Sequence, residues 1–257
     1  MRYARITLPG RNTPITAPVT PDGLSVDLGG DIVPVPEGGF APAIPGWVYG
    51  PLLNERSTWE RFSDQMQDKP YVAPPTAPVL YFKPQNTHVG HQARITLPAY
   101  AERVELGASL GLVFRRQTAH ATPENALDNV AGVTIVLDLS VPNDSIYRPP
   151  VQEKCWDGSC PIGPFVTDLV DLPDLTQLTL KTYVNGSLVD ERRHAGLVRD
   201  PAHLVADVTA FMALSEGDVL MLGYPVGAVP TAKRGDHIRV EVERLGALEC
   251  TLAGEQA

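Results

Sequence analysis

The sequence of 257 residues is short of cysteine, and no apolar signal core opens it. Its three cysteines, Cys155, Cys160 and Cys250, cannot all pair within one chain, and the first stretch, MRYARITLPG, lacks a long hydrophobic run. Without a secretion signal, we expect these residues to be reduced thiols. A zinc site at Cys155 and Cys160 is disfavoured, because four residues separate them and no second ligand pair lies nearby.

Positive charge is also scarce. The chain has 21 Lys and Arg residues against 30 Asp and Glu residues, a net charge of −9 and a pI near 5.1. Such a field repels nucleic acids and anionic membranes, so neither is expected as a partner, whereas a few local cations can still hold a small anion. The longest uncharged stretch, near 219–232, is broken by glycines and prolines, which disfavours a membrane span. We therefore expect a cytoplasmic protein.

The chain changes character near residue 75. Residues 1 to about 50 are rich in Pro and Gly, 56–67 is the first helical stretch, and 69–79 contains four prolines. Beyond this point, apolar β-branched runs recur with few helical patterns between them. We therefore predict a mixed β-rich (α+β) fold, with a small N-terminal domain over residues 1–75 and a larger domain over residues 76–257.

Two local patterns are specific. In LTLKTYVNGSLVDE, alternating residues flank Asn185-Gly186, a pair suited to a type I′ hairpin turn. In RDPAHLVADVTAFMAL, Asp200 can cap a helix that has Pro201 in its first turn, and apolar residues recur along one stripe. We predict a hairpin and a helix with a packing face.

Three polar residues interrupt apolar or turn-rich contexts and are candidate site residues. Lys83 ends a strand before Pro84; on this stretch alone, a surface lysine is the favoured interpretation. Asp138 lies in a β-branched run, where a carboxylate must be paired, hydrogen-bonded or bound to a metal. Arg148 suits a substrate carboxylate, although a structural salt bridge explains it as well.

Further candidates lie in two rigid turns. Lys154 precedes the turn that contains Asp157-Gly158, and a strand ends at Gly223-Tyr224-Pro225, where a backbone N–H can face an anion. A tight turn is the simpler explanation for each. The six histidines do not assemble a site, and the sequence has no nucleophile elbow, phosphate loop or dinucleotide fingerprint.

Taken in order, several stretches resemble the fumarylacetoacetate hydrolase family across residues 78–252. The stretches are PVLYFKPQNT, LGLVF, AGVTIVLDLS, KCWDGSCPIGP, YVNGSLVDE, SEGDVLMLGYPVG and GDHIRVEVERLGALE. The similarity is greatest to the N-terminal half of the bifunctional isomerase/decarboxylases of 4-hydroxyphenylacetate degradation, which also occurs as a separate chain. The resemblance implies a β-roll with a small N-terminal domain that carries a lid-like helix, dimeric assembly, and short unsaturated di- or tricarboxylate substrates.

The metal site of the family is altered in this sequence. Typical members use a Glu-x-Glu strand and an Asp to hold Mg²⁺, Mn²⁺ or Ca²⁺, and the resemblance puts Gly107 and Ser109 at the two glutamate positions. Asp138 falls on the third ligand and is the one candidate metal ligand. A single carboxylate rarely holds a dedicated cation, so no cofactor is firmly expected. Glu105 lies on the same strand face and can replace a ligand only if the register shifts.

The lid and the glycine turn depart from the family as well. Where members have a His and a Glu that act as an acid/base pair, this sequence has Thr58 and Arg61. Tyr224 stands where members usually have Thr before Pro. Lys83 and Lys154 match family lysines, and Lys154 is the stronger catalytic candidate, together with Asp138. Lys83, Arg148, Gly223 and Tyr224 are the residues that we expect to bind substrate.

Three functions remain open. The first is a lyase or isomerase that converts 5-oxopent-3-ene-1,2,5-tricarboxylate to 2-hydroxyhepta-2,4-diene-1,7-dioate and its isomer, with lysines and Arg148 stabilising the dienolate in place of a metal. The second is a catalytically degenerate, metal-free subunit, in a homodimer or in a heteromer with a metal-bearing sister chain. The third is a carboxylate-binding protein without turnover. The resemblance favours the enzyme, and the activity of the chain alone stays open.

Overall fold

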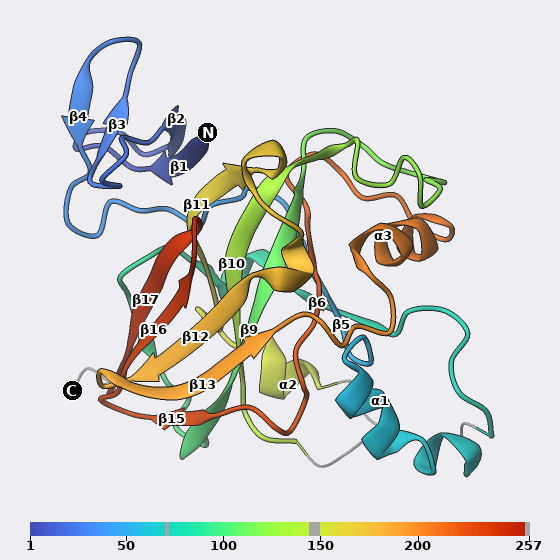
Figure 1. The fold of residues 1–257 in the computed structure, drawn as a ribbon. Coiled ribbons are helices and arrows are strands. Elements are labelled where there is room, and N and C mark those ends of the chain that lie inside the picture. The colour runs from blue at the N-terminus through green and yellow to red at the C-terminus, as the bar shows by residue number, and fades with distance from the viewer. Residues whose placement is uncertain (70–71, 144–149, 255–257) are drawn as a thin grey trace.

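Two mixed β-sheets lie face to face in the computed structural model, which describes residues 1–69, 72–143 and 150–254 (Figure 1). The larger sheet of this described part has the order β2-β1-β11-β10-β9-β14-β5-β6, with β15 beside β9 and β7 beside β11. Its strands are β1 (Arg2–Ile6), β2 (Ile15–Pro18), β5 (Val48–Pro51), β6 (Leu80–Lys83), β7 (His88–Val89), β9 (Arg103–Phe114), β10 (Val130–Ser140), β11 (Cys160–Asp168), β14 (Val219–Met221) and β15 (Thr231–Lys233).

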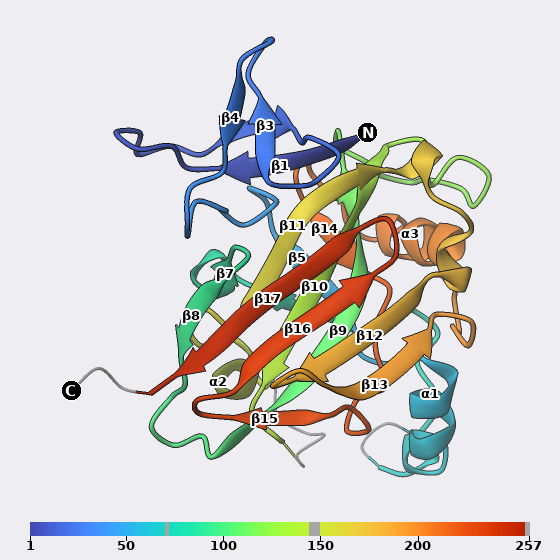
Figure 2. The same ribbon diagram turned by 60° about the vertical axis from the view of Figure 1, so that its left-hand side comes forward.

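The second sheet has the order β13-β12-β16-β17-β8 and covers the middle of the first (Figure 2). Its strands are β8 (Ala93–Thr96), β12 (Thr179–Val184), β13 (Ser187–Arg193), β16 (His237–Val242) and β17 (Gly246–Ala253). Side chains from both sheets form the main hydrophobic cluster, in which Leu110 and Ile135 meet Leu180 and Val240. This sheet-rich arrangement confirms the predicted mixed β-rich fold.

The N-terminal strands adjoin the larger sheet at one end. Strand β1 pairs with β11, and β3 (Ser25–Asp27) and β4 (Ile32–Pro34) form a separate hairpin above them (Figure 1). Ile6, Val26 and Phe165 share a small hydrophobic cluster there. Strand β5, which also precedes residue 75, pairs with β6 and β14. The domain boundary near residue 75 stays a prediction.

Helices are short and lie around the sheets. The α-helices are α1 (Arg56–Phe62), α2 (Val151–Lys154) and α3 (Pro201–Thr209), and the 3₁₀ turns are η1 (Gln65–Gln67), η2 (Gln85–Thr87), η3 (Leu169–Asp171) and η4 (Leu175–Gln177). Asp200 caps α3 by accepting a hydrogen bond from the backbone N–H of His203 at 2.9 Å. This confirms the predicted helix, and α1 with η1 covers the helical stretch predicted over 56–67.

Local chemistry explains the hairpin and the edges of the site. Asn185 and Gly186 have φ angles of 51° and 80°, both positive as a type I′ turn requires, so the predicted β12–β13 hairpin is confirmed. Strand β6 ends at Lys83, because the next residue, Pro84, cannot donate a hydrogen bond to a strand ladder. Lys83 is thereby held at a strand end.

The central strands β9 and β10 are buried on both faces. On β10, Ile135, Leu137 and Leu139 face the second sheet, and the alternate residues Val136 and Asp138 face the other way. The candidate site is built on this second face.

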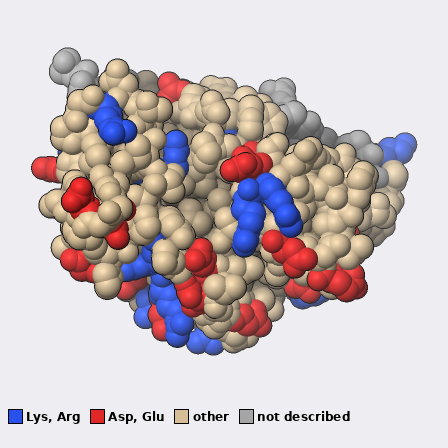
Figure 3. Space-filling model, turned by 90° about the horizontal axis from the view of Figure 1, so that it is seen from above, with Lys and Arg blue, Asp and Glu red and all other residues tan. Residues whose placement is uncertain are grey.

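The exposed surface is mixed in charge on the side seen from above, where Lys and Arg side chains are scattered among Asp and Glu (Figure 3). Within the described residues, no helix is both long and apolar enough to span a membrane.

Candidate functional site

Asp138 is the centre of a buried ion cluster. It is 0% exposed, and its two carboxylate oxygens accept hydrogen bonds from four groups. Oδ1 lies 2.8 Å from Lys83 Nζ and 3.1 Å from Ser140 Oγ, and Oδ2 lies 2.7 Å from both Lys154 Nζ and the Tyr224 hydroxyl. A carboxylate has about four acceptor positions. All of them are therefore used within the protein.

The charges of the two lysines control the ionisation of Asp138. Burial by itself raises the pKa of this carboxyl, but the ammonium groups of Lys154 and Lys83 lower it far more, so its pKa lies well below the ordinary value. Asp138 is thus a carboxylate that neutralises only one of two buried cations. The cluster keeps an excess positive charge.

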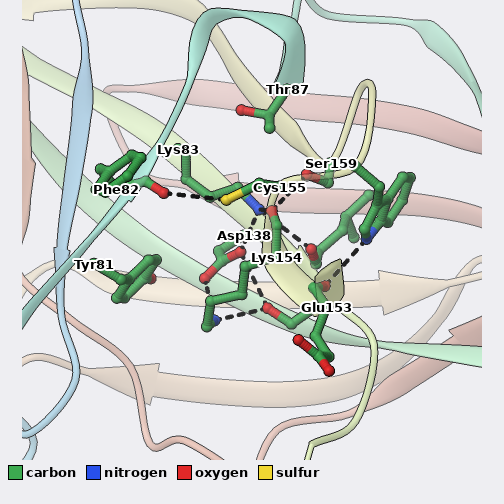
Figure 4. Close-up of polar contacts among 12 residues, drawn as sticks. Tyr81, Phe82, Lys83, Thr87, Asp138, Glu153, Lys154, Cys155 and Ser159 are labelled. Atoms are coloured by element: carbon green, nitrogen blue, oxygen red, sulfur yellow. Dashed lines mark hydrogen bonds and ion pairs between the residues drawn. The ribbon is translucent and has the colours of Figure 1, made fainter. Parts of the chain in front are cut away.

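Lys83 is fully buried, with 0% exposure, behind the carboxylate (Figure 4). Besides Asp138, its Nζ donates to the backbone carbonyl of Leu139 at 3.3 Å and to the carbonyl of Lys154. These three bonds use the three donors of an ammonium group. The surface interpretation of Lys83 is therefore wrong: the strand end points inward because its charge has a partner there.

Lys154 ends α2 and extends its ammonium group over the same carboxylate. Its Nζ lies 2.8 Å from Ser140 Oγ and 2.7 Å from the Tyr224 hydroxyl, in addition to Asp138, and it lies 4.3 Å from the centre of the Tyr81 ring. The turn after α2 is fixed by Ser159 Oγ, which donates to the Lys154 carbonyl at 2.8 Å. The turn and the ring together hold the ammonium in one place.

Tyr224 occupies the space next to Gly107. Gly223, with a φ of 108°, turns the chain after β14, and the Tyr224 ring then lies over β9. A Cβ built on Gly107 lies 2.5 Å from the ring carbon Cε1, closer than two carbon atoms can approach. Burial and the nearby Asp138 charge raise the pKa of the Tyr224 phenol well above its ordinary value, so its hydroxyl stays a donor.

The neighbouring Ser109 holds the glycine turn. Its hydroxyl accepts a hydrogen bond from the Gly223 N–H at 3.1 Å and donates to the Leu110 carbonyl at 3.0 Å. The sequence leaves open that a backbone N–H of this turn faces an anion. The Gly223 N–H is instead bound within the protein, because Ser109 lies directly behind it.

These residues do not fit a divalent cation. Gly107 lies opposite Asp138 in the β9–β10 register, but the Tyr224 ring fills the space that a side chain from position 107 would cross. All acceptor positions of Asp138 are already paired, and two ammonium groups would repel a cation. Within the described residues, no three His, Cys, Asp or Glu side chains gather into a possible metal site.

A cavity of about 410 Å³ opens beside Lys154. Its polar lining includes Glu105, Ser140, Glu153 and Lys154, and most of the remaining lining is apolar. The lid segment, defined here as residues 52–67, contributes Leu52, Leu53, Phe62 and Met66 to the apolar part. Lys154 therefore joins the buried ion cluster to a space that can hold a small molecule.

The lid segment is fixed to the glycine turn. The guanidinium group of Arg61 donates to the Val226 carbonyl, two residues beyond Tyr224. Thr58 is buried, and its hydroxyl has no hydrogen-bond partner in the described chain. In the lid segment, Arg61 thus acts in attachment and Thr58 in packing.

The structure brings Lys83, Asp138, Lys154 and Tyr224 together from four distant stretches, and Gly223 lies beside them. Arg148, the remaining candidate, lies outside the described residues. Cys155, Cys160 and Cys250 are all free.

Sequence reasoning overlooked two contacts of Lys154, and it discounted a third residue. Ser140 was detectable, because it lies two residues beyond Asp138 and a strand places such residues on one face. Tyr81 had no local signal, since only the sheet order brings β6 close to α2. Glu105 lines the cavity, so it lies closer to the site than the sequence indicated.

Comparison with known proteins places these features in context. The sequence profile of the fumarylacetoacetate (FAA) hydrolase C-terminal domain matches residues 48–253. A 4-hydroxyphenylacetate degradation bifunctional isomerase/decarboxylase from Escherichia coli is 34% identical over 211 residues, which is 82% of this chain and 48% of that protein. The chain spans about half the length of the curated relatives of this kind that it matches.

Solved structures show the same fold. A 2-hydroxyhepta-2,4-diene-1,7-dioate isomerase from Mycobacterium marinum superposes with a TM-score of 0.81 at 23% identity, over 100% of both chains. A 5-carboxymethyl-2-hydroxymuconate delta-isomerase from Mycobacterium smegmatis superposes with a TM-score of 0.79 at 25% identity, also over 100% of both chains.

Proposed function

This chain belongs to the fumarylacetoacetate hydrolase family, and from that membership we propose that it decarboxylates or isomerises short unsaturated oxo-carboxylates in 4-hydroxyphenylacetate breakdown. The proposed substrate is 5-oxopent-3-ene-1,2,5-tricarboxylate, and the proposed product is 2-hydroxyhepta-2,4-diene-1,7-dioate or its isomer. The names of the similar proteins support this pathway. The reaction is proposed to proceed without a metal.

One observation carries the proposal: two buried ammonium groups share a single carboxylate at the wall of a cavity. Lys83 and Lys154 both bind Asp138, so one positive charge has no fixed counter-ion among the described residues of this cluster. An uncompensated buried cation favours an anionic ligand. Lys154 lines the cavity and is therefore the group that a substrate oxygen can reach.

The chemistry assigned to Lys154 is electrostatic. In decarboxylation the bond to the departing carboxylate breaks, and its electron pair moves into the conjugated oxo group to give a dienolate. In the structure, one N–H of the Lys154 ammonium donates to Ser140 Oγ. Ser140 also lines the cavity and its hydroxyl can rotate, so this N–H can donate to the dienolate oxygen instead. Removing a fixed donor of this kind typically reduces a rate by about 10²- to 10³-fold.

Lys83, Asp138 and Tyr224 are assigned a positioning role. Lys83 and Asp138 are fully buried, and the Tyr224 hydroxyl donates to Asp138 while it accepts from Lys154. They fix the ammonium of Lys154 in place and are not expected to touch the substrate.

The test is turnover of the purified chain with the tricarboxylate, followed by CO₂ release and absorbance of the diene. Lys154→Met is expected to lose at least about 10²-fold in kcat, in line with the loss of one electrostatic stabiliser. Lys181→Met is the matched control, because the Lys181 side chain is 41% exposed and its Nζ lies 4.0 Å from Glu191. Unchanged turnover in Lys154→Met would refute the assignment.

A second function has its own support. All acceptor positions of Asp138 are used, and the Tyr224 ring lies over Gly107. Both features also suit a metal-free subunit that pairs with a metal-bearing sister chain in place of forming a homodimer. In that case the isolated chain is inactive, and turnover begins only when a family member with an intact Glu-x-Glu strand is added. The same assay separates the two functions.

A further inference from the structure

Glu105 is a carboxyl group in the cavity, and the proposed chemistry of Lys154 gives it no role. It is half-buried on β9, lines the same cavity as Lys154, and has no hydrogen-bond partner among the described residues. A carboxyl group that faces a cavity without such a partner among the described residues is available to a ligand.

The strand register places Glu105 beside the catalytic lysine. Glu105 lies directly opposite Ser140 on β10, as Gly107 lies opposite Asp138. Side chains at directly opposed positions begin about 4.5–5.5 Å apart. Since Ser140 Oγ lies 2.8 Å from Lys154 Nζ, Glu105 and Lys154 flank the same hydroxyl at the cavity wall.

The rest of the cavity offers few groups that can carry a proton. Thr58 and Arg61, in the lid segment, do not line the cavity. Glu153 also lines the cavity and, like Glu105, is half-buried, but it lies on the short helix α2. Glu105 is the carboxyl on the strand, directly opposite Ser140.

We propose that Glu105 is the proton-transfer residue of this cavity, a role that rests on the proposed function. In decarboxylation, the C–C bond to CO₂ breaks and leaves a dienolate. The Glu105 carboxylic acid then gives its proton to the dienolate, on oxygen to form the 2-hydroxydiene or on carbon to form its 2-oxo isomer, and the resulting carboxylate regains a proton from water. In isomerisation of the 2-hydroxydiene, the enol oxygen loses its proton and Glu105 delivers a proton to the chain carbon.

The surroundings of Glu105 support this role. Burial raises the pKa of its carboxyl, and the charge of Asp138 on β10 acts in the same direction. Three cations oppose them: Lys154 on α2, Arg61 on α1 and Arg103 on β9 itself. The net effect is a raised pKa, which brings a carboxyl group closer to the range in which it can both give and accept protons.

The experiment measures hydrogen exchange, which does not depend on decarboxylation. Wild-type protein is incubated with 2-oxoheptanedioate in D₂O, and NMR follows the loss of its C3 hydrogens. Wild type is expected to exchange them. Glu105→Gln is expected to slow exchange by at least about 10²-fold, as removal of a general acid/base does, while calorimetry gives an unchanged Kd for the same compound. Glu105→Asp should recover part of the rate.

Glu102→Gln is the matched control, because Glu102 is an exposed carboxylate three residues earlier, outside this cavity. The inference is overturned if wild type does not exchange, if Glu105→Gln exchanges at the wild-type rate, or if Glu153→Gln alone abolishes exchange. Exchange that depends on Glu105, in a protein that does not turn over the tricarboxylate, would refute the proposed function and leave the role of Glu105 standing.

Discussion

The ring of Tyr224 lies where a side chain on Gly107 would begin. A Cβ at position 107 falls 2.5 Å from the ring carbon Cε1, and the Tyr224 hydroxyl lies 2.7 Å from Asp138 Oδ2. One residue thus fills the space of a missing side chain and uses an acceptor of the carboxylate opposite it. The two positions are therefore expected to be coupled energetically.

Gly107→Ala is expected to destabilise the protein by about 1–3 kcal/mol, because the added methyl group overpacks a buried contact with an aromatic ring. In a Tyr224→Thr background, the loss of stability caused by Gly107→Ala should be smaller, because the aromatic ring is absent. Urea unfolding of the four proteins gives the coupling energy of this cycle. Additive effects would show that the two residues are independent.

Asp138→Asn is expected to lower the free energy of unfolding by about 3–5 kcal/mol at pH 7, because two buried ammonium groups lose the carboxylate that both of them bind. The pKa of Asp138 is lowered on folding, so its stabilisation is complete above the ordinary pKa and is lost as the pH falls below about 4. Urea unfolding between pH 7 and 3 measures both effects.

The wild type should therefore lose stability more steeply below pH 4 than Asp138→Asn does. Asp207→Asn is the control: Asp207 Oδ2 lies 2.5 Å from Arg199 Nε in a pair whose carboxylate is 47% exposed. Exposed pairs contribute about 0–1 kcal/mol. A similar loss in both variants would contradict the central role of Asp138.

Arg61→Ala is expected to weaken binding of 2-oxoheptanedioate about three- to tenfold, because a side-chain hydrogen bond of about 1 kcal/mol fixes the lid segment over the cavity. Isothermal calorimetry measures this Kd. Arg56→Ala serves as the control, since Arg56 is an exposed arginine on the same helix. Equal affinities of wild type and Arg61→Ala would show that the attachment to Val226 does not matter.

Glu55→Gln tests a buried carboxyl at the start of the lid segment. Glu55 is 8% exposed, and burial raises its pKa to about 7 although Arg192 opposes the shift. The folded state thus keeps a proton that the unfolded state releases, so wild-type stability falls as the pH rises from about 4.5 to 7.

Glutamine carries no charge, so Glu55→Gln should be more stable than wild type at pH 8, by on the order of 3 kcal/mol at most, and equal to it at pH 4. Urea unfolding at both pH values provides the comparison. A variant that is less stable at pH 8 would show that Glu55 is ionised and paired in the fold.

Much of the fold was accessible from the sequence, because its signals are local. Asn185-Gly186 specifies its turn through positive φ angles, and Asp200 specifies its helix start through one side-chain hydrogen bond. The resemblance also predicts that Gly107 and Ser109 stand at the two glutamate positions of the family, and this correspondence stays a prediction.

The geometry of the site was accessible only in part. Nothing local to Lys83 distinguishes a surface lysine from a buried one, since its partners lie on β10 and α2, at least 55 residues away along the chain. The position of the Tyr224 ring depends on the turn at Gly223 and on Ser109 behind it. Such contacts arise from sheet order, which a single sequence does not state.

The hydrogen bonding of Asp138 also makes positions 107 and 224 interdependent. A glutamate at position 107 would collide with the Tyr224 ring, and a threonine at position 224 would leave Asp138 and Lys154 each without one partner. Either substitution alone is therefore expected to give a less stable protein. A side chain can enter at position 107 only together with a smaller residue at position 224.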